Sequence, residues 1–297
     1  MELIQAKGDT WYLAAAELIP IYRLEGGRCI LLDSGLESER ETLSAALDRA
    51  GLTPVGVFGS HTHRDHSVNN GWLRERYGTR ICLPEGEAVI ASTPLMCKQV
   101  YASLSLEGLM EDCGGMVCRA DETVGPEDGT AEFLGVPFRV LHAPGHTPDH
   151  ICTITPDGVC YTADLMLAGP ALETARLPYH YVHAVARASM EKLRDAAGGC
   201  ACCIAAHRAV FRDPASVAAG NLALLDRVGG EMLELLRTPL TLGELVAAVV
   251  ERKKLLTHSE MKAARYARSV QCFVEYLRDT GRLDVVVDRG MRRFVRR

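Results

Sequence analysis

Three of the 10 histidines in the chain fall within six residues, in the segment HTHRDH at residues 61–66. Side chains alternate along an extended segment, so His61 and His63 project to the same side and can bind one metal ion. Asp65 and His66 are adjacent and point in different directions, which suits a second ion better than the first. Imidazole and carboxylate ligands together suit zinc, iron or manganese. The segment therefore predicts metal-assisted chemistry.

Further candidates lie downstream and upstream of this segment, each directly after a strand-like run. His146 follows RVLHAPG, Asp164 follows VCYTA, His207 follows ACCIAA and Asp33 follows ILL. Functional side chains of α/β folds gather at strand ends, which favours a shared site. The spacing along the chain does not by itself show that these segments meet in space.

The elements that must position these side chains are short strands alternating with helices, an α/β pattern. A buried strand at 54–58 ends just before the first histidine of the motif. Residues 92–128 have only partial helical periodicity and are predicted to form short helices and a loop, as a flap over the site. The other predicted elements are hairpins at 19–35, 131–145 and 151–164, helices at 37–51, 69–77, 182–196 and 214–236, and strands at 79–84 and 201–207.

HTHRDH resembles the H-x-H-x-D-H signature of the metallo-β-lactamase superfamily, and the later PGHT, TAD and AAH segments resemble further motifs of that family in the expected order. The resemblance covers most of residues 10–235 and implies an αββα sandwich. It implies that one metal binds at a first position and another at a second position, with Asp164 bridging them. The implied ligands are His61, His63 and His146 for the first position, and Asp65, His66 and His207 for the second.

By the same resemblance, Asp33 would orient a ligand through a hydrogen bond. The expected cofactors are two divalent ions, with zinc favoured and iron or manganese as alternatives. They would lower the pKa of a shared water to about 7, so that hydroxide attacks an electrophilic carbonyl or phosphorus. Asp65 is the candidate catalytic residue for proton delivery. The retained Asp164 argues against antibiotic hydrolysis and favours the glyoxalase II, lactonase and ribonuclease Z side of the superfamily.

A boundary is predicted at Thr238-Pro239, which gives a catalytic domain at 1–236 and a second domain at 237–297. In the second domain, Thr241 and Glu244 form a capping-box pattern, a longer helix ends at Gly281, and a hairpin turns at Arg289-Gly290. This order resembles the winged-helix extension of a group of glyoxalase II-like hydrolases. The net charge is −5, but residues 237–297 hold 14 Lys and Arg against 7 Asp and Glu.

These features leave three functions open. The first is hydrolysis of a small thioester, ester or lactone, with the C-terminal domain covering the site or forming a homodimer. The second is a phosphodiesterase or ribonuclease whose basic C-terminal domain contacts nucleic acid. The third is a metal-bound regulator that binds DNA, which the complete ligand set disfavours. The N-terminus lacks a signal-peptide pattern and no apolar run is long enough to span a membrane, so we expect a cytoplasmic protein.

The loop after Asp164 is a candidate substrate pocket, with Tyr179, His180, Tyr181 and His183 as its residues. His142 and His150 flank His146, and they are expected to pack against ligands rather than to bind metal. The cysteines, 11 in number and irregular in spacing, argue against a disulfide framework. Cys200, Cys202 and Cys203 are interpreted as small residues of a buried strand.

Overall fold

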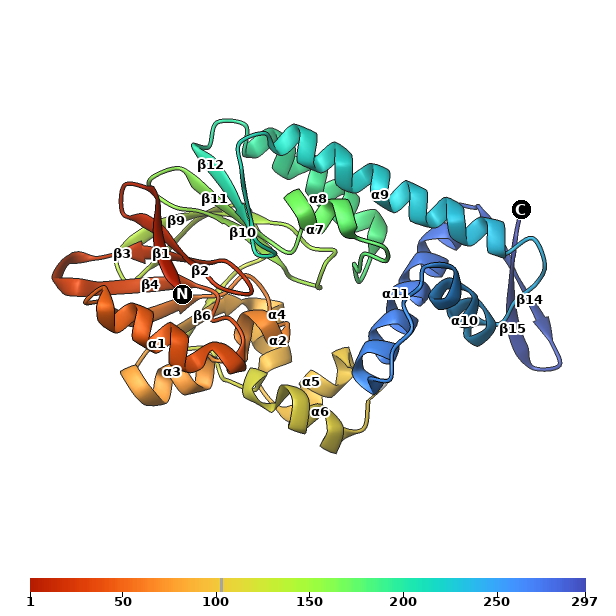
Figure 1. Ribbon diagram of the computed structural model, residues 1–297, viewed down its shortest axis with the longest axis horizontal. Helices are drawn as coiled ribbons and strands as arrows, with labels where there is room; N and C mark the ends of the chain where they lie inside the picture. The colour runs from red at the N-terminus through yellow and green to blue at the C-terminus, as the bar shows by residue number, and fades with distance from the viewer. Residues whose placement is uncertain (102–103) are drawn as a thin grey trace.

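The computed structural model describes residues 1–101 and 104–297; residues 102–103, within the predicted flap, lie outside the described residues. In the described part of the chain, strands form a seven-stranded sheet and a six-stranded sheet that face each other, as well as a terminal hairpin. Figure 1 shows helices on the outer side of each sheet. The first sheet has the order β1 (Glu2–Lys7), β2 (Thr10–Ala14), β3 (Ile19–Arg23), β4 (Arg28–Leu32), β5 (Thr53–Phe58), β6 (Arg80–Pro84) and β7 (Glu122–Val124).

The second sheet has the order β13 (Ala209–Phe211), β12 (Cys202–Ala205), β11 (Val159–Ala163), β10 (Ile151–Ile154), β9 (Val136–His142) and β8 (Gly129–Phe133). The helices between the strands are α1 (Arg40–Arg49), α2 (Arg64–Ser67), α3 (Asn70–Tyr77), α4 (Glu85–Ala91), α5 (Pro94–Val100), α6 (Leu106–Cys113), α7 (Gly169–Thr174), α8 (His183–Ala196) and α9 (Pro214–Leu235). The predicted hairpins, strands and main helices are confirmed within a few residues. The sequence patterns did not predict β13 and α7, which are too short to show a periodicity.

Alternating side chains of the buried strands hold the layers together. In β4, Ile30 and Leu32 point to the cluster between the sheets, whereas Leu31 points to the cluster beneath α1 and α3. Between the sheets, the rings of Phe58 and Phe138 lie 4.9 Å apart, centroid to centroid. Burying each such side chain contributes about 1.5–3 kcal/mol. The resulting layers, helix, sheet, sheet and helix, confirm the predicted αββα sandwich.

Strand pairing explains why distant motifs emerge at one edge. Strands β4 and β5 are parallel, with Leu32 opposite Phe58, so the segments that begin at Asp33 and at residue 59 leave the first sheet side by side. Strands β11 and β12 are also parallel, with Ala163 opposite Ala205. Asp164 and the segment 206–208 therefore leave the second sheet together.

The C-terminal segment consists of α10 (Leu242–Arg252), α11 (Glu260–Asp279) and the hairpin β14 (Leu283–Asp288) and β15 (Met291–Arg296). The predicted capping box of Thr241 and Glu244 is present. The hydrophobic cluster on the outer face of the second sheet continues through α8 and α9 to these elements, and Phe273 is completely buried in it. In Figure 1, α11 extends back from the C-terminal region toward α5. The boundary at 236/237 and the winged-helix comparison stay predictions.

Two further sequence expectations concern membranes and cysteines. Within residues 1–101 and 104–297, no helix is both long and apolar enough to cross a bilayer. All 11 cysteines are free in the described chain, as the irregular spacing predicted. Cys202 and Cys203 are buried on β12, which agrees with their interpretation as packing residues, whereas Cys200 precedes the strand and is only half-buried.

Candidate metal centre

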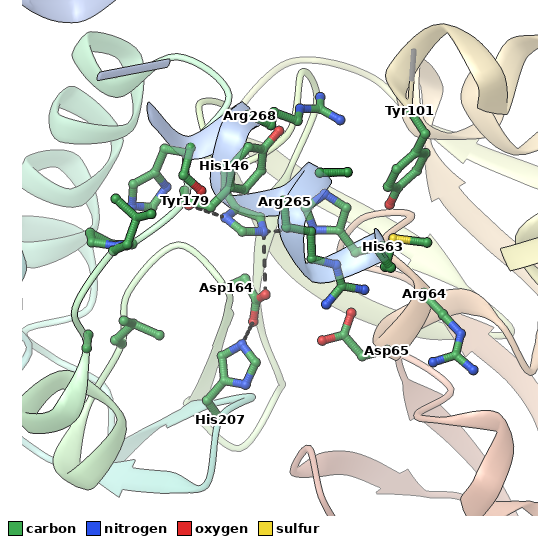
Figure 2. A pocket seen from close by; sticks show the side chains of 18 of the residues that line it. His63, Arg64, Asp65, Tyr101, His146, Asp164, Tyr179, His207, Arg265 and Arg268 are labelled. Atoms are coloured by element: carbon green, nitrogen blue, oxygen red, sulfur yellow. Dashed lines mark hydrogen bonds and ion pairs between the residues drawn. The ribbon is translucent and has the colours of Figure 1, made fainter. Parts of the chain in front are cut away.

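The structure brings the predicted ligands together at the edge where the two sheets meet. Residues 61–63 follow β5 after a bend at Ser60, His63 has extended backbone, and α2 then begins at Arg64. His146 lies in the loop between β9 and β10, and the amide of Ile151 at the end of this loop donates to the carbonyl of Ser60 in the first sheet. Asp164 and His207 come from the edge of β11 and β12. Figure 2 shows Asp164 between His146 and His207, with Asp65 close by.

The first position has the geometry of a ligand trio. Nδ1 of His63 lies 3.1 Å from Nε2 of His61 and 2.9 Å from Nε2 of His146. Oδ2 of Asp164 lies 3.4 Å from Nε2 of His146 and 4.0 Å from Nε2 of His61. Ligand atoms at the corners of a tetrahedron with metal distances of 2.0–2.1 Å are about 3.3 Å apart. Three of these four distances lie within about 0.4 Å of that spacing, and the four ligand atoms all lie within 4.8 Å of one another, so they can converge on one ion.

The second position lies on the other side of Asp164. Its Oδ1 atom is 3.3 Å from Nε2 of His66 and 3.3 Å from Nε2 of His207. Oδ2 of Asp65 is 3.9 Å from Nε2 of His66. The two oxygens of Asp164 thus face different groups of histidines, as the predicted bridging role requires.

Hydrogen bonds on the far side of each ring fix which nitrogen faces the cluster. The carbonyl of Tyr179, 3.2 Å from Nδ1 of His146, can only accept, so this Nδ1 carries the proton and Nε2 is left free. His66 Nδ1 has Asp33 as its acceptor at 2.8 Å, and Oε2 of Glu17 lies 2.7 Å from Nδ1 of His207, at ion-pair distance. Such partners set ring orientation and raise the basicity of a ligand. Asp33 occupies the orienting place that the sequence predicts, and Glu17 was missed.

Asp33 also organises the neighbouring backbone. It accepts from the amide and the hydroxyl of Ser60 at 2.6 and 2.7 Å, and from the hydroxyl of Tyr161 at 2.7 Å. Since Ser60 Oγ donates to Asp33, it accepts from Nδ1 of His61, 2.9 Å away. Asp33 has a left-handed φ of 69°, and Ala163 and Arg208, which adjoin Asp164 and His207, have φ values of 44° and 63°. Strained backbone of this kind persists where the surroundings enforce it, typically at functional sites.

Buried atoms that lack a well-formed hydrogen bond point to a cation. Nε2 of His66 and Oδ1 of Asp164 lie 3.3 Å apart as an ion pair, yet neither makes a hydrogen bond of good geometry in the described residues. Leaving such atoms unsatisfied costs about 1–3 kcal/mol each, and more for charged groups. A divalent ion between them would satisfy both atoms. The donor set, its spacing and these orphaned atoms all fit a metal centre.

The electrostatics differ between the two positions. Burial holds the pKa of His61 and of His63 well below the usual value, and it lowers that of His146 to about 3. The charge of Asp164 raises the pKa of His207 to about 11. Burial opposes ionisation of Asp164, yet the charges of His207 and His66 hold its pKa well below the usual range. The first position is therefore a neutral imidazole trio at neutral pH, whereas the second contains imidazolium–carboxylate pairs that a metal must replace.

A cavity of about 340 Å³ opens above the cluster. Its lining includes Tyr179 and His180 from the predicted pocket loop. His183 was predicted there as well, and that prediction is wrong: it does not line the cavity but is buried, with its ring 4.0 Å from that of Phe273. The backbone turns into α8 at this point, which directs His183 toward the core.

One wall of the cavity comes from the C-terminal helix α11, through Met261, Ala264, Arg265, Arg268 and Ser269. The guanidinium of Arg268 lies 5.7, 5.2 and 5.7 Å from the rings of Tyr101, Tyr179 and Tyr181. It also donates to the carbonyl of Val100. The sequence placed these arginines in a basic tail, and only their i, i+3 spacing on one helix indicated that they share a face.

The remaining histidines near the site behave as packing or bridging groups. Nε2 of His142 lies 2.7 Å from Oδ1 of Asp149. His150 is completely buried, and its ring centroid lies 5.1 Å from that of His61. Neither belongs to a potential metal-binding group in the described residues.

Comparisons with known proteins agree with this geometry. Residues 19–203 match the family model described as the metallo-beta-lactamase superfamily. A hydroxyacylglutathione hydrolase from Rhizobium meliloti (strain 1021) is 30% identical over 131 residues, 44% of this chain and 41% of that protein. One from Thiobacillus denitrificans is 33% identical over 109 residues, 37% of this chain and 32% of that protein. The chain thus matches less than half the length of these relatives.

Solved structures show the same fold over the whole chain. A beta-lactamase domain protein from Burkholderia ambifaria superposes with a TM-score of 0.73 at 18% identity, covering 100% of this chain and 94% of that one. A metallo-beta-lactamase family protein from Thermus thermophilus gives a TM-score of 0.68 at 20% identity, covering 100% and 98%. Because the family model spans more than half of its residues, the chain belongs to the metallo-beta-lactamase superfamily.

Proposed function

We propose that the protein is a dinuclear metal-dependent hydrolase that cleaves a small thioester, ester or lactone. The observation that carries the proposal is the position of the ligand cluster, which forms the floor of a cavity of about 340 Å³ with α11 as one wall. Cavities of about 300–1,000 Å³ are typical of small-molecule sites. The matched hydroxyacylglutathione hydrolases add a reason to test thioesters first.

In this proposal His61, His63 and His146 hold one ion, Asp65, His66 and His207 hold the other, and Asp164 bridges them. Zinc suits the donor set, with iron and manganese as alternatives. The ions, when bound, supply Lewis acidity and activation of water. Asp65 is partly exposed and lines the cavity, so its carboxylate can accept a proton from the attacking water and pass it to the leaving group.

The cavity wall suggests which substrates fit. Leu104, Leu167 and Leu177 give it apolar surface for an acyl group. In Figure 2 the side chain of Arg265 extends from α11 toward Asp65. Arg265 has no hydrogen-bond or ion-pair partner within residues 1–101 and 104–297, and an unpaired guanidinium favours an anionic substituent on the substrate.

The nuclease alternative has less support from the C-terminal surface. Several of its arginines are paired with acidic side chains: Arg293 with Glu244, Arg296 with Glu234, and Arg297 with Asp284. Paired cations have less charge to offer to phosphates. A cavity of about 340 Å³ with a helix as one wall also suits a small substrate better than a polynucleotide.

The test is a paired hydrolysis assay on one metal-loaded preparation, with an acyl-glutathione thioester and an activated phosphodiester as substrates. We expect turnover of the thioester, and an Asp164→Ala variant should lose metal and about 10²–10³-fold in kcat/KM together, since it removes the bridging ligand. Turnover of the phosphodiester alone would make the nuclease function the leading one. Two full metal equivalents with normal turnover in Asp164→Ala would show that the bridging role is wrong.

A further inference from the structure

Outside the ligand set, a carboxylate joins the two loops that carry the first position. Glu87 lies in the first turn of α4 and is completely buried. Its Oε2 atom accepts from the amide and the hydroxyl of Thr62, at 2.9 and 2.5 Å. Its Oε1 atom accepts from the hydroxyl of Thr147 at 2.5 Å and from the amide of Asp149 at 3.2 Å. Each oxygen therefore holds a different loop.

The two loops are those that bear the first trio. Thr62 stands between His61 and His63, and Thr147 directly follows His146. The rings concerned are 2.9–3.1 Å apart at their facing nitrogens, so a shift of one loop by a few tenths of an ångström changes the site. Because Glu87 contacts the neighbours of the ligands rather than the ligands, it can set the separation of the loops without occupying the site.

The contact between α4 and the loop of His146 is also close-packed. The amide of Gly86 donates to Oδ2 of Asp149 at 2.7 Å, which returns the bond that Asp149 donates to Glu87. A Cβ atom at residue 86 would lie 2.8 Å from Cβ of Asp149, so glycine permits this approach. Reciprocal bonds and close packing make α4 a rigid support for the loop of His146.

The carboxylate of Glu87 is stabilised by hydrogen bonds rather than by an ion pair. Burial raises its pKa, and the largest opposing effects come from the hydroxyl and amide donors of Thr62, Thr147 and Asp149. No ion pair joins Glu87 to a cationic side chain of the described residues. A buried carboxylate without a cation is costly. A metal ion at the first position, whose ligands adjoin Thr62 and Thr147 along the chain, would supply the missing positive charge.

We propose that Glu87 is a positioning residue for the first metal position: it fixes the distance between His146 and the pair His61 and His63, and its charge favours a cation there. The inference rests on the proposed metal centre but not on the identity of the substrate. Glu87→Gln keeps the size of the side chain but leaves one acceptor oxygen, which can hold one loop and not the other. Glu85→Gln is the matched control, since Glu85 lies on the same helix turn and is exposed.

The experiment titrates metal-free protein with Zn²⁺ against a chelating dye, and with Co²⁺ to read the coordination from its visible spectrum. His146→Ala identifies which binding event belongs to the first position. We expect Glu87→Gln to weaken that event about 10- to 100-fold and to alter its Co²⁺ spectrum, with the other event and the Glu85→Gln protein unchanged.

Thr62→Val and Thr147→Val extend the test if Glu87→Gln folds poorly. Each removes one hydroxyl donor from a different loop, yet each should weaken the same binding event. In the Glu87→Gln background, each threonine substitution should lower the Zn²⁺ affinity by a smaller factor than it does in the unmodified protein. Unchanged Zn²⁺ affinity in all three variants would overturn the proposal. These measurements use no substrate, so a protein that binds both ions but fails to hydrolyse the thioester would refute the proposed function and leave this inference standing.

Discussion

Glu17 Oε2 lies 2.7 Å from Nδ1 of His207, and this contact crosses from the loop before β3 to the end of β12. It parallels the contact between Asp33 and His66, so His66 and His207 each have a carboxylate next to Nδ1, the ring nitrogen that faces away from the ligand cluster. The two carboxylates, of Glu17 and Asp33, come from loops next to strands of the first sheet. His207 instead follows β12 of the second sheet. The second position is therefore assembled across the sandwich.

Removing the charge of Glu17 should weaken the second position. In Glu17→Gln we expect the affinity for one of two metal equivalents to fall about 10- to 100-fold, because the ring of His207 loses the carboxylate charge that orients it and raises its basicity. Metal content after dialysis against a graded chelator series measures the effect. Asp33→Asn should act on the same equivalent through His66, and also on the first position through Ser60 and His61, so Glu17→Gln is the more selective variant. Loss of the other equivalent instead would contradict the assignment of these ligands.

Metal binding should release protons unequally. The pKa of His207 is raised to about 11 by Asp164, and that of His66 is raised by Asp164 and Asp65 against the effect of burial, so both rings are charged at pH 7 in the metal-free protein. The first trio has lowered pKa values and is neutral. Binding at the second position should displace about two protons and binding at the first almost none.

Calorimetric titration in buffers of different ionisation enthalpy measures those protons. The same pairs affect the stability of the metal-free protein. Because the folded pKa of His207 lies above its ordinary value of 6.5, its contribution is complete below pH 6.5 and is lost as the pH rises through about 11. Equal proton release for the two metal equivalents would be inconsistent with these charge states.

Arg265 should select anionic substrates. In Arg265→Gln we expect KM for an acyl-glutathione thioester to rise about 10- to 100-fold, which corresponds to the loss of one charge-assisted hydrogen bond of about 1.5–3 kcal/mol. An acyl-N-acetylcysteamine thioester, which has no carboxylate, should show almost no change. Arg278→Gln is the control, as it lies on the same helix about 20 Å further along. An equal rise for both thioesters would argue against anion recognition.

Arg268 should fasten α11 to the catalytic part of the chain. Its contacts with Tyr101, Tyr179 and Tyr181 and with the carbonyl of Val100 join segments on either side of the cavity. Arg268→Leu should cost about 1–3 kcal/mol of stability and should expose α11 to limited proteolysis. Thermal unfolding of the metal-loaded protein measures the loss. An unchanged melting temperature and digestion pattern would mean that other packing, such as that of Phe273, holds the helix.

Local sequence patterns predicted side chains of metal-binding type, whereas their grouping into two metal positions came from the resemblance to the metallo-β-lactamase superfamily. The alternation of an extended segment placed His61 and His63 on one side, and the positions of Asp33, His146, Asp164 and His207 after apolar runs placed them at strand ends. These predictions depend on neighbours along the chain, where periodicity and spacing carry the information. The helices and hairpins of the sandwich were predictable for the same reason.

Other features depend on how the two sheets and the C-terminal helix meet. Glu17 and Glu87 are single acidic residues in a loop and a helix turn, with no pattern that distinguishes them from surface carboxylates. Arg265 and Arg268 line the cavity because Phe273 packs α11 onto the hydrophobic cluster of α8 and α9. Both arginines lie more than 100 residues after Asp164 in the sequence. His183 turns away from the predicted pocket because α8 begins there. Contacts between segments so far apart arise from strand pairing and core packing, which residue spacing does not encode.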